Sequence, residues 1–143
     1  MNEEHIHSWW VQDWDAPDWR KAWARLMKDV PIIINKSGIA LNGPSGDAST
    51  ERAVMIDRKK GIAFKGALGI TQDTFEFLPV WATTYCPAGL AVDTVCSVNT
   101  GGHPYDAVVT CILLRAWELG QDNFDVGYSL YFTSLLIHFE PIR

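Results

Sequence analysis

Cysteine is scarce in this sequence, and its pattern excludes a disulfide framework. The 143 residues include Cys86, Cys96 and Cys111, an odd number without a Cys-x-x-Cys pair. Small extracellular domains with weak cores depend on several disulfides, whereas cytoplasmic proteins keep their thiols reduced. We therefore expect a cytoplasmic protein with free thiols. Cys111 lies in an apolar run and is expected in the core. A transient bridge between Cys86 and Cys96 is the alternative.

The sequence also lacks a long apolar run and a basic, apolar leader. The longest stretches without Asp, Glu, Lys or Arg are residues 77–92 and 126–139. Proline, glycine and polar residues interrupt them, and both are shorter than the roughly 18 apolar residues that suggest a membrane-spanning helix. Residues 1–5 are polar and acidic, unlike a signal peptide. We therefore expect no membrane association.

Positive charge is in the minority. The sequence has 12 Lys and Arg residues and 17 Asp and Glu residues, which gives a net charge of -5. An acidic surface repels phosphate backbones, so we expect no nucleic-acid partner. The dense basic run Arg58-Lys59-Lys60 is interpreted as a solvated loop tip. The 48% hydrophobic share is typical of a globular chain and predicts a single domain over residues 1–143.

Two segments have helical patterns. Apolar residues recur at spacings of three and four over residues 16–29, after a proline in the first turn, which predicts an amphipathic helix. Pro104–Leu119 is apolar nearly all round and predicts a buried helix, with Asp106 at its positive end. Gly120 is placed to end this helix in the left-handed conformation.

Apolar runs separated by turn residues predict the strands. Residues 31–35 and 39–43 are expected to form one hairpin, and residues 52–56 and 61–66 a second. Further candidate strands are residues 74–78, 81–85, 91–96, 124–126 and 130–139. The predicted class is α+β: an antiparallel β-sheet of hairpins packed on one buried helix of the C-terminal half, with an N-terminal amphipathic helix at its edge.

The sequence contains no catalytic motif. His5 and His7 alternate as a metal-binding pair on a strand would, but no third ligand stands at a zinc-site spacing. We interpret them as part of a flexible terminus. There is no Gly-x-Ser-x-Gly elbow, and the order of cysteines and histidines favours no Cys–His pair. We therefore favour a protein that is not an enzyme and expect no catalytic residue, metal or cofactor.

One helix end nevertheless gathers polar residues. His103, Tyr105 and Asp106 begin the predicted buried helix, after residues 100–102 with sequence Thr-Gly-Gly. A helix N-terminus offers free N–H groups and partial positive charge, so a small acid could bind there. Gly-Gly-His-Pro matches no phosphate loop, and a plain helix cap is the competing interpretation. A ligand at this end would make the protein a small-molecule-binding protein or a modest enzyme.

Tryptophan is abundant near the N-terminus. Five of the seven tryptophans lie in the first 23 residues: Trp9, Trp10, Trp14, Trp19 and Trp23. Trp9, Trp10 and Trp14 follow no period, so residues 1–14 form either an exposed aromatic arm or a segment that closes the core. The arm motivates the leading hypothesis, a non-enzymatic binding or adaptor protein of unknown role. It would self-associate into a homo-oligomer or dock a protein partner.

The start of the C-terminal helix supports one resemblance. The run from Pro104 to Leu113, with sequence Pro-Tyr-Asp-Ala-Val-Val-Thr-Cys-Ile-Leu, resembles a Pro-Tyr-Asp-plus-apolar-helix pattern. That pattern is typical of short uncharacterised reading frames carried by phages, integron cassettes and other mobile elements. The resemblance extends over the last two-thirds of the chain. It implies a cargo protein of a mobile element and supplies no catalytic residues.

Overall fold

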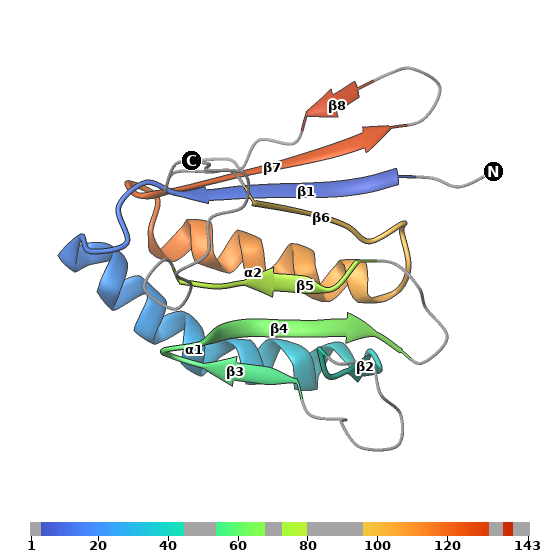
Figure 1. Cartoon of the computed structure of the whole chain (residues 1–143), viewed down its shortest axis with the longest axis horizontal. Coiled ribbons are helices and arrows are strands. Elements are labelled where there is room, and N and C mark those ends of the chain that lie inside the picture. Colours follow the sequence, from blue (N-terminus) through green and yellow to red (C-terminus); the bar gives the residue numbers. More distant parts are fainter. Residues whose placement is uncertain (1–3, 45–53, 68–72, 80–95, 132–135, 139–143) are drawn as a thin grey trace.

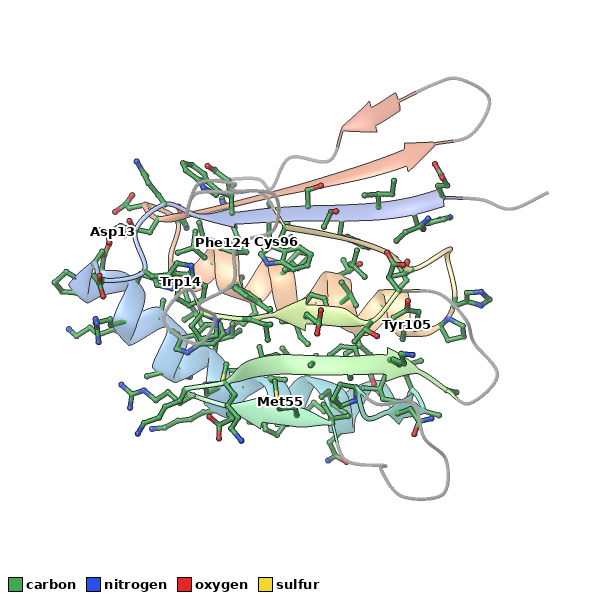
Figure 2. The ribbon with its side chains drawn as sticks, viewed as in Figure 1. Asp13, Trp14, Met55, Cys96, Tyr105 and Phe124 are labelled. Carbon is green, nitrogen blue, oxygen red and sulfur yellow. The ribbon has the colours of Figure 1, made fainter. Side chains whose placement is uncertain are left out.

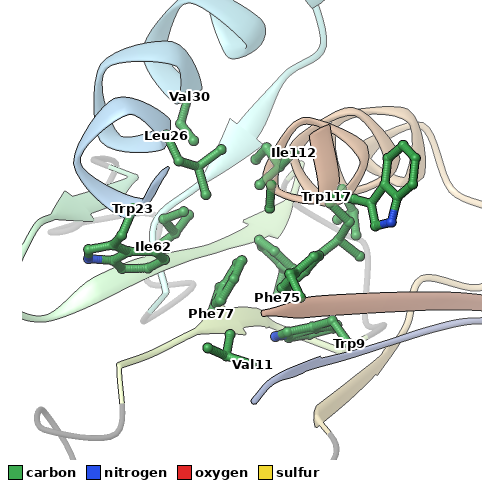
Figure 3. Packing of buried hydrophobic residues seen from close by; sticks show 14 of the residues in the cluster. Trp9, Val11, Trp23, Leu26, Val30, Ile62, Phe75, Phe77, Ile112 and Trp117 are labelled. Carbon is green, nitrogen blue, oxygen red and sulfur yellow. The ribbon is translucent and has the colours of Figure 1, made fainter. Parts of the chain in front are cut away.

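A computed structural model describes residues 4–44, 54–67, 73–79, 96–131 and 136–138. It shows an α+β fold in which two helices pack against one face of a β-layer (Figures 1 and 3). The helices are α1 (Pro17–Ser37) and α2 (Tyr105–Leu119). The predicted fold class is confirmed, although the helices and strands differ in several places from those expected.

The β-layer consists of two antiparallel sheets. The first has the order β6 (Cys96–Asn99), β1 (Glu4–Val11), β7 (Phe124–Tyr131) and β8 (Leu136–His138). The second has the order β2 (Leu41–Asn42), β4 (Gly61–Gly66) and β3 (Met55–Asp57), and β5 (Phe75–Phe77) also pairs with β4. Two hydrogen bonds join the sheets: the Asp73 N–H donates to the Asn99 carbonyl at 3.3 Å, and the Asn99 N–H donates to Asp73 Oδ2 at 2.9 Å.

Residues 4–11 form an inner strand, not a free aromatic arm. All eight residues of β1 pair with β7, and Ile6 to Trp9 also pair with β6. Because side chains alternate along a strand, His5, His7, Trp9 and Val11 share the face that packs toward the helices. The histidine pair therefore belongs to the sheet, and its interpretation as a flexible terminus is wrong.

Helix α1 is longer than the helix predicted over residues 16–29. It continues through residues 31–35, which were expected to be a strand, and contains Pro31. Val30 is buried, and Ile33 and Ile34 pack against the core at helical spacing, so tertiary contacts override the β preference of the branched residues. Gly38 then ends the helix in the left-handed conformation with φ of 66°. The first hairpin is consequently wrong, and β2 pairs with β4 instead.

The second hairpin is confirmed over its described residues. Strands β3 and β4 pair around a turn in which Asp57 Oδ1 accepts the N–H groups of Lys59 and Lys60, both at 2.8 Å. Gly61 follows with φ of 109°, and a Cβ there would lie 2.5 Å from the carbonyl oxygen of Phe77. Only glycine allows β5 to approach this closely. The expected strand over residues 74–78 is also present, as β5.

The C-terminal strands are divided differently from the prediction. Strand β7 runs without interruption from residue 124 to residue 131, so it joins the expected strand over 124–126 to the start of the one over 130–139. Residues 136–138 form β8 and pair back onto β7. The candidate strand over residues 81–85, most of the one over 91–96, and Cys86 lie outside the described residues.

Helix α2 confirms the predicted buried helix, except along one exposed stripe. Its buried residues are Tyr105, Val108, Val109, Ile112, Leu113, Ala116 and Trp117. Cys111 is exposed, which corrects its expected place in the core. Gly120 has φ of -131°, so it does not adopt the predicted left-handed conformation. Its lack of a side chain serves packing instead, because a Cβ would lie 2.5 Å from Trp19 Cε3.

Aromatic rings fill the space between the helices and the sheets (Figure 3). Trp19 stacks on Phe124 with ring centroids 5.5 Å apart, and Trp14 meets Trp23 edge-on at 5.0 Å. Phe77 contacts several of these rings. Each aromatic pair contributes about 0.5–1.5 kcal/mol beyond its buried area. The N-terminal tryptophans therefore help to hold α1 on the β-layer.

Candidate functional site

Tyr105, which is labelled in Figure 2, marks the N-terminal end of α2. Three polar side chains meet at this end, where α2 lies against the first sheet. His7 comes from β1, Thr100 follows β6, and Asp106 lies in the first turn of α2; we call these three residues the polar cluster. His7 Nε2 lies 2.7 Å from Asp106 Oδ1, and the Thr100 hydroxyl donates to the same oxygen. The exposed fraction is 4% for the His7 side chain and 24% for that of Asp106.

The polar cluster favours the ionised form of Asp106. Burial raises the pKa of this carboxyl group, but the hydrogen bonds from His7 and Thr100 lower it more, helped by the nearby charges of His7 and His5. The net result is a pKa below the ordinary aspartate value. The positive end of the α2 dipole acts in the same direction. Asp106 therefore carries a negative charge that is held between two strands and a helix.

The loop after β6 wraps around the backbone and ring of His5. The Thr100 N–H donates to the His5 carbonyl at 3.0 Å, while Asn99 Oδ1 accepts the N–H groups of His5 and Gly101 at 3.1 and 2.9 Å. Gly102 has φ of 74°, and a Cβ there would lie 2.9 Å from His5 Nε2. This loop fixes the start of β1 beside the polar cluster.

The three residues predicted at this helix end have different roles. Asp106 belongs to the polar cluster. Tyr105 is buried, and its hydroxyl donates to the Asp73 carbonyl at 2.7 Å; burial raises its pKa, as do the charges of Asp73 and Asp106. His103 is half-buried and contributes its backbone, because its N–H donates to the Thr100 carbonyl and its own carbonyl accepts the Asp106 N–H. Within the described ranges, no residue hydrogen-bonds its ring.

The polar cluster connects three elements, β1, the end of β6 and α2, through hydrogen bonds to one carboxylate oxygen. Oδ1 of Asp106 serves both His7 and Thr100, so one charged oxygen ties β1 and the end of β6 to α2. His7 and Thr100 were not predicted from the sequence as partners of Asp106. The available signal was the alternation of His5 and His7, which is typical of one face of a strand. In the part of the chain that is described, no group of three His, Cys, Asp or Glu side chains is arranged to hold a metal.

The tryptophans predicted to bind a partner are distributed between the core and its margin. Trp9 is 3% exposed and contacts Phe75 and Phe77 with ring centroids 5.2 and 5.8 Å apart. Trp14 is half-buried against the tryptophans of α1, and Trp10 is half-buried on the opposite face of β1 from Trp9. Trp9 in particular is a core residue and is not available to a partner.

A different surface is exposed on α1. Its buried residues are Trp19, Ala22, Trp23, Leu26 and Val30. The opposite side of the helix carries what we call the outward stripe, which consists of Lys21, Arg25, Lys28, Ile32 and Lys36, all exposed and three or four residues apart. Ile32 is 53% exposed, and among the described residues it is the one large hydrophobic side chain that is exposed.

Most cations of the outward stripe lack an ion-pair partner among the described residues. Arg25 forms an ion pair with Asp29 at 3.3 Å, and its side chain remains 60% exposed. Asp29 also accepts a hydrogen bond from Arg115 of α2 at 2.8 Å. Between described residues, the three lysines of the stripe form no ion pair. The stripe therefore presents an apolar side chain among positive charges.

Comparisons with known proteins add no family or relative to this geometry. Neither models of protein families, nor curated protein sequences, nor solved structures give a match to the chain. Among the described residues, no helix is long and apolar enough to cross a membrane.

Proposed function

We propose that this chain is a non-enzymatic binding or adaptor protein that docks a protein partner on the outward stripe of α1. The single observation that supports the proposal is the exposure of Ile32 between Lys28, Lys36 and Arg25. Because Ile32 is 53% exposed, burying the rest of its side chain stabilises a complex by about 0.8–1.6 kcal/mol. An apolar centre with a polar, charged rim is also the usual anatomy of a transient protein interface.

The stripe replaces the aromatic arm as the expected docking surface. The arm hypothesis depended on exposed tryptophans, and Trp9 instead lies in the core. Self-association through the stripe is disfavoured, because a two-fold dimer would place like charges opposite each other. A different protein therefore fits this surface better than a second copy.

A peptide selection tests this proposal. Peptides selected on the immobilised full chain are measured against the wild type, Ile32→Ser and Ala107→Ser, where Ala107 is an exposed control residue on α2. We expect Ile32→Ser to weaken the binding of the selected peptides about four- to fifteenfold and Ala107→Ser to leave it unchanged. Equal binding to all three proteins would show that the stripe is not the docking surface.

A second candidate is a small-molecule site at the N-terminal end of α2. The observation that favours it is the Asp106 carboxylate, which is charged and remains 24% exposed beside His7. A thermal-shift screen of small ligands tests it, because a ligand that binds only the native state raises the melting temperature. A shift that persists in Asp106→Asn and in His103→Ala would count against this site.

A further inference from the structure

The positive charges of this acidic chain are concentrated in two segments. Residues 15–37 and 54–60 contain eight Lys and Arg residues and four Asp residues, whereas the whole chain has a net charge of -5. Most of these cations lie on α1, and the others are Arg58, Lys59 and Lys60 in the β3–β4 turn. The two segments therefore carry a net positive charge within a negative molecule.

A hydrogen bond brings the two segments together. The indole N–H of Trp23 in α1 donates to the carbonyl of Arg58 at 2.9 Å, so it holds the β3–β4 turn beside the helix (Figure 1). Asp57 is occupied within the turn, where it accepts the N–H groups of Lys59 and Lys60. The cationic side chains of the turn are exposed, as are those of the outward stripe. Trp23 belongs to the core-facing side of α1, so the turn flanks the helix on that side, and we call the outward stripe alone the basic face.

The size of the basic face decides which anionic partner fits it. Charges separated by more than about 8 Å are screened at physiological ionic strength. A small ligand therefore responds to the local excess of positive charge and not to the net charge of the whole chain. A membrane surface or a long nucleic acid extends over more of the molecule and also meets its acidic remainder. A short acidic segment of a protein meets the basic face alone. It can also supply an apolar side chain to cover Ile32, which a phosphate backbone cannot.

We infer that the docked partner contributes a short acidic segment that lies along the outward stripe, with an apolar side chain against Ile32. This inference rests on the proposed function and adds the chemistry of the partner. Charge then provides a fast, salt-sensitive encounter, and Ile32 fixes the position of the segment.

The test uses four defined probes and two charge-matched variants of the full chain. The probes are a twelve-residue Glu-rich peptide with one central leucine, the same peptide with alanine in place of leucine, a single-stranded thymidine oligonucleotide, and vesicles containing phosphatidylserine. Lys21→Gln/Lys28→Gln removes two positive charges from the basic face. Ser97→Glu/Gln121→Glu makes the same change in net charge at exposed positions elsewhere. Urea denaturation verifies that both variants are folded.

We expect the leucine peptide to bind more tightly than the alanine peptide and more weakly at higher salt. The double Lys→Gln variant should bind it about five to tenfold more weakly, because exposed ion pairs are individually weak. The Ser97→Glu/Gln121→Glu variant should bind within about twofold of the wild type. Tighter binding of the oligonucleotide or the vesicles through the same lysines would overturn the inference, as would equal losses in both variants.

The two proposals can fail separately. Selected peptides that depend on Ile32 but carry no acidic residues would preserve the docking surface and refute the acidic partner. Binding of the acidic peptide that depends on Lys21 and Lys28 but not on Ile32 would refute the apolar contact. Loss of both dependences would refute the docking surface itself.

Discussion

Replacing Asp106 by asparagine removes a charge from the polar cluster and preserves its shape. Both His7 and the Thr100 hydroxyl reach Oδ1 of Asp106, and an asparagine side chain can present an oxygen at that place. The substitution therefore isolates the effect of the negative charge. We expect the Asp106→Asn variant to fold and to be less stable than the wild type at neutral pH.

The magnitude follows from the two hydrogen bonds and the helix end. A hydrogen bond to a charged group contributes about 1.5–3 kcal/mol, and one between neutral groups about 0.5–1.5 kcal/mol, so each bond loses about 1 kcal/mol. The interaction of a carboxylate with a helix N-terminus adds about 0.3–1 kcal/mol. Asp106→Asn should lower the free energy of unfolding by about 2–3 kcal/mol at pH 7.

The pH dependence provides a sharper test. The pKa of Asp106 is lower in the folded protein than the ordinary value of 3.8 because the hydrogen bonds outweigh the effect of burial. The unfolded chain therefore takes up a proton first as the pH falls. The associated stability is fully present above about pH 5 and is lost as the pH falls through the folded pKa. The difference between wild type and variant should shrink as the pH falls from about 5 toward 3.

Urea denaturation followed by tryptophan fluorescence measures both effects. Asp125→Asn, at an exposed position on β7, is the matched control and should change stability by less than about 0.5 kcal/mol. A decrease of less than about 0.5 kcal/mol in the free energy of unfolding of Asp106→Asn at pH 7 would contradict the proposal that the Asp106 charge stabilises the fold. A loss that is equally large at about pH 3 would show that shape, not charge, explains the effect.

Three further predictions concern the backbone and one thiol. Gly61→Ala should lower the free energy of unfolding by more than about 2 kcal/mol, because it combines strain at φ of 109° with a Cβ 2.5 Å from the carbonyl oxygen of Phe77. Gly38→Ala has open space around the new Cβ, so it should lower the same quantity by only about 1 kcal/mol in the same urea assay. Pro31→Ala should stabilise the protein by about 1–3 kcal/mol, because proline inside a helix lacks an N–H donor. A lower melting temperature for this variant would contradict the prediction. Cys111 should react with iodoacetamide in the native state, and mass spectrometry would refute its exposure if labelling required urea.

Local patterns in the sequence were sufficient to predict those helices and strands that depend on residues close together in the chain. The apolar run ending at residue 119 predicted α2, and the turn at residues 57–60 predicted the β3–β4 hairpin. Both signals are periodic or depend on turn chemistry within about fifteen residues. The fold class could be predicted for the same reason, because it follows from the mixture of such segments.

The sequence was misleading where distant contacts decide the structure. Residues 32–34 are three isoleucines, as in a strand, but Ile33 and Ile34 complete the core-facing side of α1. The bond between His7 and Asp106 joins residues 99 positions apart. Nothing near His7 indicates that partner, because the pairing requires β1 to be an inner strand. The polar cluster was therefore found only in part, from its α2 side.

The arrangement of α1 separates the stability of the protein from the proposed binding. Its buried side carries the aromatic residues that hold the fold, and its outward stripe has no described contact with the core apart from the Arg25–Asp29–Arg115 link to α2. Substitutions at Lys21 or Lys28 should thus change binding without changing unfolding by more than about 0.5 kcal/mol. Trp23 belongs to the buried side, since it packs in the core and also holds the β3–β4 turn. Trp23→Phe would lose the hydrogen bond and keep a ring, so it should lower the free energy of unfolding and leave the binding of acidic peptides to the stripe unchanged.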